Sequence, residues 1–407
     1  MKIVQINTTY GDADSTGRNT KDIHEWLLER GEDSKVFCVR FNDVSCEADS
    51  VELFSSTPDQ KIHGLLSRLT GLQGYFSPHA TRKLLRRLEE EKPDVVLLGV
   101  LHSNCIHFPL LFKYFREKQI PVIIVLHDCW FFTGHCTHFV KYHCEKWKTG
   151  CAHCPGMRED NVSWFFDTSR KCYRNKQRWY QGLKYGIVGV SDWITGISRQ
   201  SVLGSTKYVR RIYNWIDQTV FCPKDKRILR ANYRFSETDK IIIAVASVWS
   251  EIKGLSTIAY LAKKIPDSKV LLVGRYRELG VRLASNIYFI GHINQPKRLA
   301  EYYALSDVFV NPSEQETFGK TTAEAICCGL PVVAYRNTGT TEIVEGAGGI
   351  LVESGDREGF SEAVQRLFRS ENSIEAVKTG HLFALNAFDK EENIRKYHDF
   401  MKEMISA

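Results

Sequence analysis

Two acidic residues on either side of a glycine form the strongest chemical signal in this sequence. Glu316 and Glu324 flank Phe318-Gly319-Lys320-Thr321, which follows the apolar run Val308–Val310. Gly319 lets a ligand approach the backbone closely, and exposed amides at a helix start suit a diphosphate, with Thr321 adding a hydroxyl. Carboxylates accept hydrogen bonds from the hydroxyls of a sugar or a ribose. The segment predicts a pocket for a phosphorylated, hydroxyl-rich molecule; for Glu316 alone, complementing the helix dipole is the alternative.

A second loop of the same kind carries a cation. Ser247–Gly254 follows the apolar run Ile241–Ala246 and precedes a helical pattern. Lys253 in this loop can neutralise a departing diphosphate, which is the main electrostatic task when such a group leaves. An ordinary surface lysine is the alternative interpretation of Lys253.

The elements that must position these loops alternate along the chain. Short Val- and Ile-rich runs separated by amphipathic helical patterns predict parallel sheets covered by helices on both faces. Two series of such runs predict two doubly wound α/β domains, with ligands at the carboxyl ends of the strands in a cleft where the domains face each other. The predicted strands are Ile3–Ile6, Val36–Val39, Val95–Val100, Val122–Leu126 and Ile187–Val190, then Ile241–Ala246, Lys269–Val273, Ile287–Ile290, Val308–Val310 and Val332–Ala334.

The periodicity is interrupted near Tyr213–Pro223, which predicts domains at 1–213 and 214–388. A last helix at 389–407 has no strand after it, and we expect it to pack back on the first domain. No apolar run approaches the ~18 residues that cross a bilayer. The N-terminus has the pattern of a first strand and lacks that of a signal peptide.

Composition favours a cytoplasmic globular protein. The net charge of +7 is mild, fits anionic small molecules or anionic lipid, and does not demand nucleic acid. Twelve cysteines without a secretory signal indicate reduced thiols rather than a disulfide framework.

The segment from Glu316 to Glu324 resembles the E-x-F-G-x-x-x-x-E signature of family-4 glycosyltransferases of the GT-B fold. The resemblance continues through Gly329-Leu330-Pro331-Val332-Val333-Ala334 and Gly339-Thr340-Thr341-Glu342-Ile343-Val344. It implies that Glu324 binds the ribose of a nucleotide-sugar donor and that Glu316 contacts the donor sugar. The backbone of Phe318, Gly319 and Lys320 would hold the sugar and the diphosphate.

Further residues acquire roles from the same resemblance. Lys253 and its neighbour Gly254 match the end of the family's R-x-x-x-x-K-G, in the loop that Ser247 opens, but Val248 stands where the family has arginine. Arg275, after another strand, is a candidate substitute. The backbone at Ile293 would lie against the nucleotide base.

Two residues of the first half also receive predicted roles. Gly17 belongs to a loop similar to the family's glycine-rich first loop, with a simple turn and N-cap as the alternative. His127, at the end of the strand Val122–Leu126, corresponds to a histidine that contacts the donor sugar. A histidine satisfied within the core is the alternative there.

The segment His127–Pro155 contains H-D-x-W-x-x-T-G-x-C and C-x-x-W-K-T-G-C-x-x-C-P patterns. These look like the colanic-acid-type glycosyltransferases of bacterial surface polysaccharide synthesis. The spacing of four cysteines could close a tetrahedral thiolate site, so a structural zinc is a hypothesis, with a reduced thiol cluster as the alternative. The four residues are Cys136, Cys144, Cys151 and Cys154.

A basic amphipathic segment, Lys61–Arg87, could lie on anionic lipid, where polyprenyl-linked acceptors reside, or be a solvated helix face. The sequence as a whole predicts a hexosyltransferase that moves a sugar from a nucleoside-diphosphate donor to a saccharide or polyprenyl-linked acceptor. We expect retention of configuration, no metal in catalysis, and a place in exopolysaccharide, capsule or O-antigen synthesis.

Three other classes of protein compete with this prediction. One is a nucleotide-sugar epimerase of the same architecture. Another is a zinc-stabilised module that binds nucleic acid, and the mild net charge disfavours this second class. A dinucleotide dehydrogenase is disfavoured because no G-x-G-x-x-G follows a strand.

Overall fold

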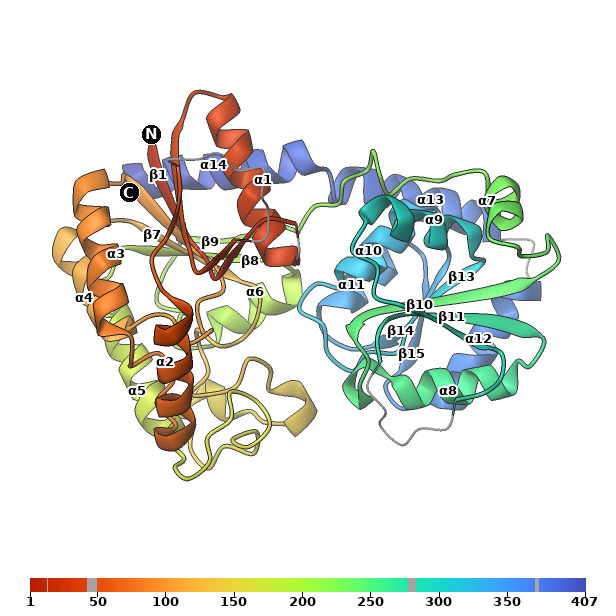
Figure 1. The fold of residues 1–407 in the computed structure, drawn as a ribbon, viewed down its shortest axis with the longest axis horizontal. Coiled ribbons are helices and arrows are strands. Elements are labelled where there is room, and N and C mark those ends of the chain that lie inside the picture. The colour runs from red at the N-terminus through yellow and green to blue at the C-terminus, as the bar shows by residue number, and fades with distance from the viewer. Residues whose placement is uncertain (13, 42–49, 277–282, 370–372) are drawn as a thin grey trace. The chain divides into compact units, whose positions relative to one another are not determined.

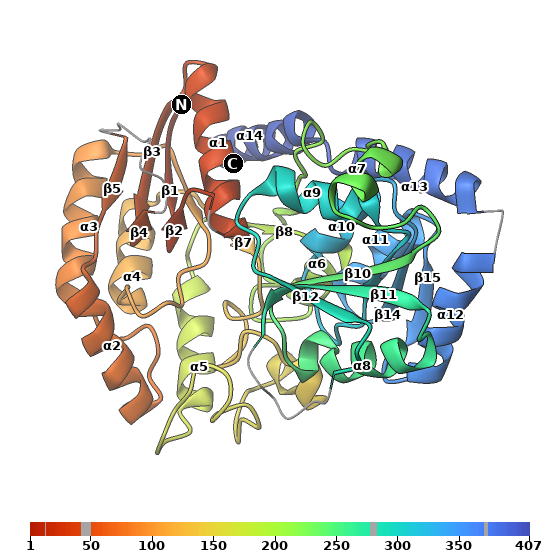
Figure 2. The ribbon, with the colours of Figure 1, turned by 45° about the vertical axis from the view of Figure 1, so that its right-hand side comes forward.

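A computed structural model describes residues 1–12, 14–41, 50–276, 283–369 and 373–407. The chain divides into two compact units. The first contains Met1–Ile212 together with Ile394–Ala407, and the second contains Tyr213–Asn393. Figures 1 and 2 show a sheet with helices on both of its faces in each unit.

The first unit is built on a seven-stranded sheet in which every pair of neighbours is parallel. Its central strands are apolar and buried throughout, as expected where helices cover both faces. The strand order is β5 (Val51–Leu53), β3 (Asp33–Cys38), β1 (Lys2–Ile6), β6 (Val95–Leu98), β7 (Val122–Leu126), β8 (Tyr185–Gly189) and β9 (Val209–Arg211). The short strands β2 (Thr9–Tyr10) and β4 (Arg40–Phe41) pair separately.

Helices α1 (Ser15–Glu29) and α14 (Lys390–Ser406) lie beside each other in this unit, where the Trp26 ring contacts His398. The end of the chain is fixed there by charge pairs, since His398 contacts Glu32 at 2.7 Å and Arg210 contacts Glu403 at 2.7 Å. The remaining helices are α2 (Thr57–Thr70), α3 (Pro78–Glu91), α4 (Phe108–Lys118), α5 (Ser169–Tyr180) and α6 (Asp192–Arg199).

The second unit has a six-stranded parallel sheet. The strand order is β12 (Ile287–Gly291), β11 (Ser268–Arg275), β10 (Lys240–Val248), β13 (Val308–Asn311), β14 (Val332–Arg336) and β15 (Ile350–Glu353). Its helices are α7 (Lys226–Asn232), α8 (Leu255–Lys264), α9 (Pro296–Leu305), α10 (Lys320–Cys327), α11 (Gly339–Gly346), α12 (Arg357–Arg369) and α13 (Ser373–Ala387).

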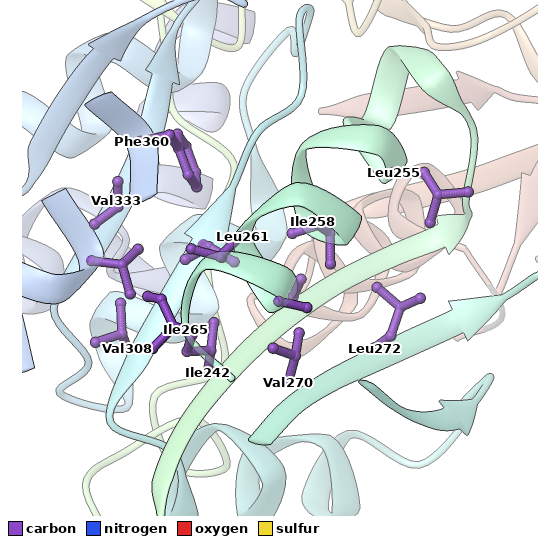
Figure 3. Packing of buried hydrophobic residues seen from close by; sticks show 14 of the residues in the cluster. Ile242, Leu255, Ile258, Leu261, Ile265, Val270, Leu272, Val308, Val333 and Phe360 are labelled. Atoms are coloured by element: carbon purple, nitrogen blue, oxygen red, sulfur yellow. The ribbon is translucent and has the colours of Figure 1, made fainter. Parts of the chain in front are cut away.

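One face of this second sheet carries a large apolar core under α8 and α12. Ile258 and Leu261 of α8 pack with Phe360 of α12 over Ile242 and Val270 of the sheet, and all five side chains are fully buried (Figure 3). Helices α9 and α10 cover the opposite face (Figures 1 and 2). The ends of the strands are therefore held in place from both sides.

The prediction of two doubly wound α/β domains is confirmed. The differences are local: β5, β9 and β15 are short strands without a long apolar run, and the sequence pattern did not predict them. The basic segment Lys61–Arg87 forms parts of two helices, α2 and α3. Among the described residues, no helix is both long enough and apolar enough to cross a membrane.

Candidate active site

The point at which the second sheet changes direction positions the predicted donor residues. β10 and β13 are neighbours, but the chain leaves β10 through α8 toward β11 and leaves β13 through α10 toward β14. The two loops therefore separate to opposite faces of the sheet, and the space between their starts is where open α/β sheets bind ligands. Lys253 lies in the loop after β10, and Glu316 lies in the loop after β13.

These two loops meet through an ion pair. The Nζ atom of Lys253 lies 2.6 Å from Oε1 of Glu316, and both side chains are partly exposed, at 32% and 21%. The backbone N–H of Glu314 also donates to the carbonyl of Ile252 at 2.9 Å. The sequence singled out both charged residues but did not predict that they would neutralise each other. An anionic ligand would compete with Glu316 for the lysine.

The loop that carries Glu316 is held from the next strand as well. The backbone N–H of Glu316 donates to Oγ1 of Thr338 at 2.7 Å, and the N–H of Gly339 donates to the carbonyl of Glu316 at 2.8 Å. Asn337 donates from its side chain to the carbonyl of Ser313 at 2.8 Å. The starts of α8, α10 and α11 are therefore joined through their loops, and each start presents the positive end of a helix dipole.

Gly319 adopts a conformation that few other residues tolerate. Its φ is +90°, and a Cβ atom at this position would lie 2.5 Å from Oγ1 of Thr340. That hydroxyl is buried and has no hydrogen-bond partner among the described residues. Both the φ and this contact favour glycine at position 319, and close approach of a ligand to its backbone stays a prediction. The Phe318 side chain is buried against Tyr213 and Phe388. Any contact of Phe318 with a ligand falls to its backbone.

Glu324 lies within α10 and is only 6% exposed. The phenol of Tyr303 donates to its Oε2 at 3.2 Å. Burial, with the nearby Glu324 charge, raises the pKa of Tyr303, so the phenol stays protonated as a donor. Nothing in the sequence pattern pointed to Tyr303, which fixes one carboxylate oxygen from the neighbouring helix α9.

Val248 stands where the family has arginine, and Arg275 lies beside it. Val248 and Arg275 are register partners on β10 and β11, so their side chains arise at adjacent positions of the sheet edge. Both residues are exposed, as is Ser247. Ile293 follows β12, the outer neighbour of β11, and is half-buried. Lys320 and Thr321 form the first turn of α10.

In the first unit, Gly17 lies in the first turn of α1. Its backbone N–H donates to Oδ1 of Asp14 at 2.7 Å, and Asp14 also accepts from the hydroxyls of Thr9 and Thr16. Asp14 is thus the N-cap that the sequence left open as an alternative. The Gly17 N–H group is therefore already used in the hydrogen bond to Asp14 in this structure.

His127 directly follows β7 and is half-buried. Its neighbour Asp128 forms an ion pair with His102, with 2.8 Å between Oδ2 and Nε2. The sequence pattern did not predict this pair. Burial alone would raise the pKa of Asp128, but the charge and hydrogen bond of His102 and the N–H of Trp130 together outweigh it and hold that pKa at about 2. Burial alone would lower the pKa of His102, but the charge and hydrogen bond of Asp128, with the charge of Asp160, together raise it.

The segment after His127 folds as an extended loop with two short 3-10 turns, Val140–Tyr142 and Lys146–Lys148. It has its own apolar cluster, because the buried Trp147 ring packs on Phe132 and Phe139. Packing of this kind contributes to holding the loop in place, which the lack of hydrophobic periodicity had not suggested.

The four predicted cysteines line one small cavity beside this cluster. The interaction of the Cys136 and Cys154 thiols raises the pKa of Cys136 and lowers that of Cys154. The N–H of Gly134 donates to Sγ of Cys151 at 3.2 Å. Cys144 completes the set, and all four are free thiols.

Within the described part of the chain, no group of three or more His, Cys, Asp or Glu side chains is arranged to hold a metal ion. The zinc hypothesis therefore stays a prediction, supported by four thiols around one cavity and not by a formed tetrahedral site.

Comparisons with solved structures define the class of fold. The chain superimposes over its full length on sucrose-phosphate synthase from Thermosynechococcus elongatus, with a TM-score of 0.74 at 16% identity and complete coverage of both chains. It also matches Anabaena Alr3699/HepE in complex with UDP, with a TM-score of 0.70 at 16% identity, covering 99% of this chain and 100% of the other. Together with the two parallel sheets, these matches establish the GT-B fold.

Comparisons of sequence match two parts of the chain to glycosyltransferase models. The model described as "Glycosyltransferase Family 4" matches residues 16–172, and the model "Glycosyl transferases group 1" matches residues 239–370. N-acetyl-alpha-D-glucosaminyl L-malate synthase of Bacillus anthracis is 30% identical over 205 residues, which are 46% of this chain and 53% of that protein. The chain thus spans about half the length of this curated relative. Each of the two parts of the chain thus matches a glycosyltransferase model, in line with the resemblance of the sequence motifs.

The Gly319 conformation leads to a stability prediction. We expect Gly319→Ala to lower the free energy of unfolding of the second unit by about 1–3 kcal/mol, because the new methyl group adds strain and contacts Thr340. Gly348→Ala is the matched control, since Gly348 has a φ of +66° but nothing within 4 Å of a Cβ. Urea unfolding followed by circular dichroism measures both variants. Equal losses in the two variants would show that the contact with Thr340 does not matter.

The thiol cavity leads to a metal prediction. If the cysteines bind structural zinc, elemental analysis of purified protein finds one Zn²⁺ per chain, and a Cys151→Ser variant loses it. Cys172→Ser, which removes a buried thiol that does not line the cavity, keeps the metal. Near-zero zinc in folded protein would exclude the hypothesis and leave a reduced thiol cluster.

Proposed function

We propose that the chain transfers a sugar from a nucleoside-diphosphate-sugar donor to a saccharide or lipid-linked saccharide acceptor. The observation that carries the proposal is the meeting of three helix starts with Lys253 and Glu316 at the switch point of the second sheet, with Glu324 on one of these helices, α10. Helix starts and a lysine suit a diphosphate, and the carboxylates suit the hydroxyls of a sugar and a ribose. The complex of Anabaena HepE with UDP supports a nucleotide in this kind of fold.

The residues of the site divide the work of such a reaction. A bound diphosphate would attract Lys253 away from Glu316, which frees that carboxylate to accept hydrogen bonds from the sugar hydroxyls. The lysine and the amides around Gly319 would then stabilise the charge that develops on the leaving diphosphate. Tyr303 would hold one oxygen of Glu324 and leave the ribose to the rest of that carboxylate.

Arg275 would take the place of the arginine that the family has at position 248, because it arises beside Val248 on the neighbouring strand. Ser247, Ile293, Lys320 and Thr321 stay predicted donor contacts at the same edge of the sheet. The roles of Gly17 and His127 also stay predictions.

Several finer features belong to the same proposal. We infer retention of anomeric configuration, with the leaving diphosphate and the acceptor hydroxyl on one face of an oxocarbenium-like sugar. No divalent metal is assigned a step. The motifs of His127–Pro155 favour a cytoplasmic role in bacterial surface polysaccharide synthesis of the colanic-acid type.

The donor assignment is tested by one matched pair of variants. We expect Glu324→Gln to weaken binding of the preferred nucleotide sugar by about 10- to 100-fold, the effect of losing hydrogen bonds to a charged group. Glu314→Gln is the control, since Glu314 is an exposed carboxylate in the loop before α10. A panel of nucleotide sugars in a thermal-shift assay identifies the ligand, and calorimetry measures the affinity.

Equal weakening in both variants, or no stabilisation of folded protein by any nucleotide sugar, would contradict the assignment. A radiolabelled donor then separates the reaction types. Transfer or slow hydrolysis of the label supports a transferase, whereas formation of an isomeric nucleotide sugar alone would indicate an epimerase.

A further inference from the structure

Three consecutive aromatic side chains are exposed in the first unit, at the segment that leads into α5. Trp164, Phe165 and Phe166 are 46%, 67% and 60% exposed. Single exposed apolar residues are ordinary, but a contiguous exposed group marks an interaction site. These residues belong neither to the donor site nor to the thiol cavity.

The backbone of this segment is well anchored, so the exposure is not the result of a loose loop. The N–H of Trp164 donates to the carbonyl of Arg68 at 2.7 Å, and the hydroxyl of Ser163 donates to the carbonyl of Phe166 at 2.7 Å. The Thr168 hydroxyl donates to the carbonyl of Gly71 at 2.6 Å. The fold thus fixes the aromatic segment beside the C-terminal end of α2, within the first unit (Figure 1).

Helix α2 extends the apolar surface. Its outward side chains Ile62 and Leu65 are 60% and 48% exposed, one turn apart on the same side of the helix. We name these two residues with Trp164–Phe166 the aromatic surface. Aromatic rings together with aliphatic side chains are the composition that settles at the boundary between lipid headgroups and acyl chains.

The charges beside the aromatic surface are positive. Lys61 and Arg68 are exposed on α2, and Arg170, Lys171 and Arg174 are exposed on α5. None of these five cations forms an ion pair with an acidic residue of the described chain. Asp167, the acid within the segment, already accepts hydrogen bonds from the N–H groups of Cys154 and Ser169.

Two basic residues of α3 have acidic partners. Lys83 lies within ion-pair distance of Glu52, and Arg87 pairs with Glu52, Glu90 and Glu91. Arg82 and Arg86 of α3 are exposed like Lys61 and Arg68 of α2, but the aromatic residues lie against α2, where the N–H of Trp164 bonds to Arg68.

We propose that the aromatic surface and its five cations dock the protein on an anionic lipid bilayer. The rings and the two α2 side chains enter the interface, and the cations face the lipid phosphates. Unpaired cations near an anionic surface add attraction that falls with salt, while the aromatic contribution does not depend on salt. The proposal concerns binding to lipid and does not depend on the chemistry of the donor site.

Flotation of the full chain with vesicles tests the proposal. Vesicles of phosphatidylcholine mixed with phosphatidylglycerol should carry the protein, and vesicles of phosphatidylcholine alone should carry much less. The triple variant Trp164→Ser, Phe165→Ser, Phe166→Ser should lower partitioning at least about tenfold. The double variant Arg170→Glu, Lys171→Glu should abolish the preference for anionic vesicles.

Matched controls carry the same changes on the second unit. Ile228→Ser with Leu382→Ser removes two exposed apolar side chains, and Lys263→Glu with Arg366→Glu reverses two exposed charges. Both controls should float like the unchanged chain, and all variants should keep the thermal shift given by the nucleotide sugar.

Two results would overturn the proposal. The first is an unchanged chain that floats with neither kind of vesicle. The second is a triple serine variant that floats as well as the unchanged chain. Self-association that the triple variant loses, in the absence of vesicle binding, would instead assign the surface to a second copy of the chain.

Discussion

The ion pair between Lys253 and Glu316 joins the two loops that diverge at the switch point of the second sheet. It exists only because β10 and β13 are adjacent while their helices leave to opposite faces. The pair brings opposite charges to 2.6 Å at a partly exposed edge, where such contacts contribute little to stability. In the proposed function, the pair holds a cation for phosphate and a carboxylate for hydroxyls, and a bound ligand would release each from the other.

The surrounding architecture keeps that edge in position. The core under α8 and α12 fixes the strands from one face, and hydrogen bonds from Asn337, Thr338 and Gly339 tie the loop of Glu316 to the next strand. At the start of α10, Gly319 is required by its φ and by the close contact with Thr340. The site is thus a property of three neighbouring strand ends, and a change in any of their loops would be felt by the other two.

Much of the candidate site in the second unit could be predicted from the sequence. Glu316, Gly319 and Glu324 were found because glycine and acidic residues after an apolar strand leave a strong local pattern. Tyr303 and the pairing of Lys253 with Glu316 were not found, since they depend on contacts between elements distant in sequence. Arg275 was a candidate substitute for the arginine missing at Val248, and the strand register places these two residues side by side.

The first unit was harder to predict. The ion pair of His102 with Asp128 joins two strand ends that no local pattern relates. In the cysteine-rich loop, the apolar packing of Trp147 and the buried Lys176, whose amine donates to the carbonyls of Trp130 and Thr133, stabilise an irregular chain. Such contacts have no periodic signature, whereas the cysteine spacing does, so the sequence drew attention to a metal and not to this packing.

The central claim is that the diphosphate of a nucleotide is recognised at the Lys253 edge of the second unit. Calorimetric titration of the protein with a nucleoside, its monophosphate and its diphosphate tests this most directly, with Lys253→Ala beside the control Lys263→Ala. We expect the diphosphate to bind at least about tenfold more tightly than the nucleoside. Lys253→Ala should remove most of this difference in affinity, and Lys263→Ala should leave it unchanged. Equal affinity for nucleoside and diphosphate, or an unchanged difference in Lys253→Ala, would contradict the central claim.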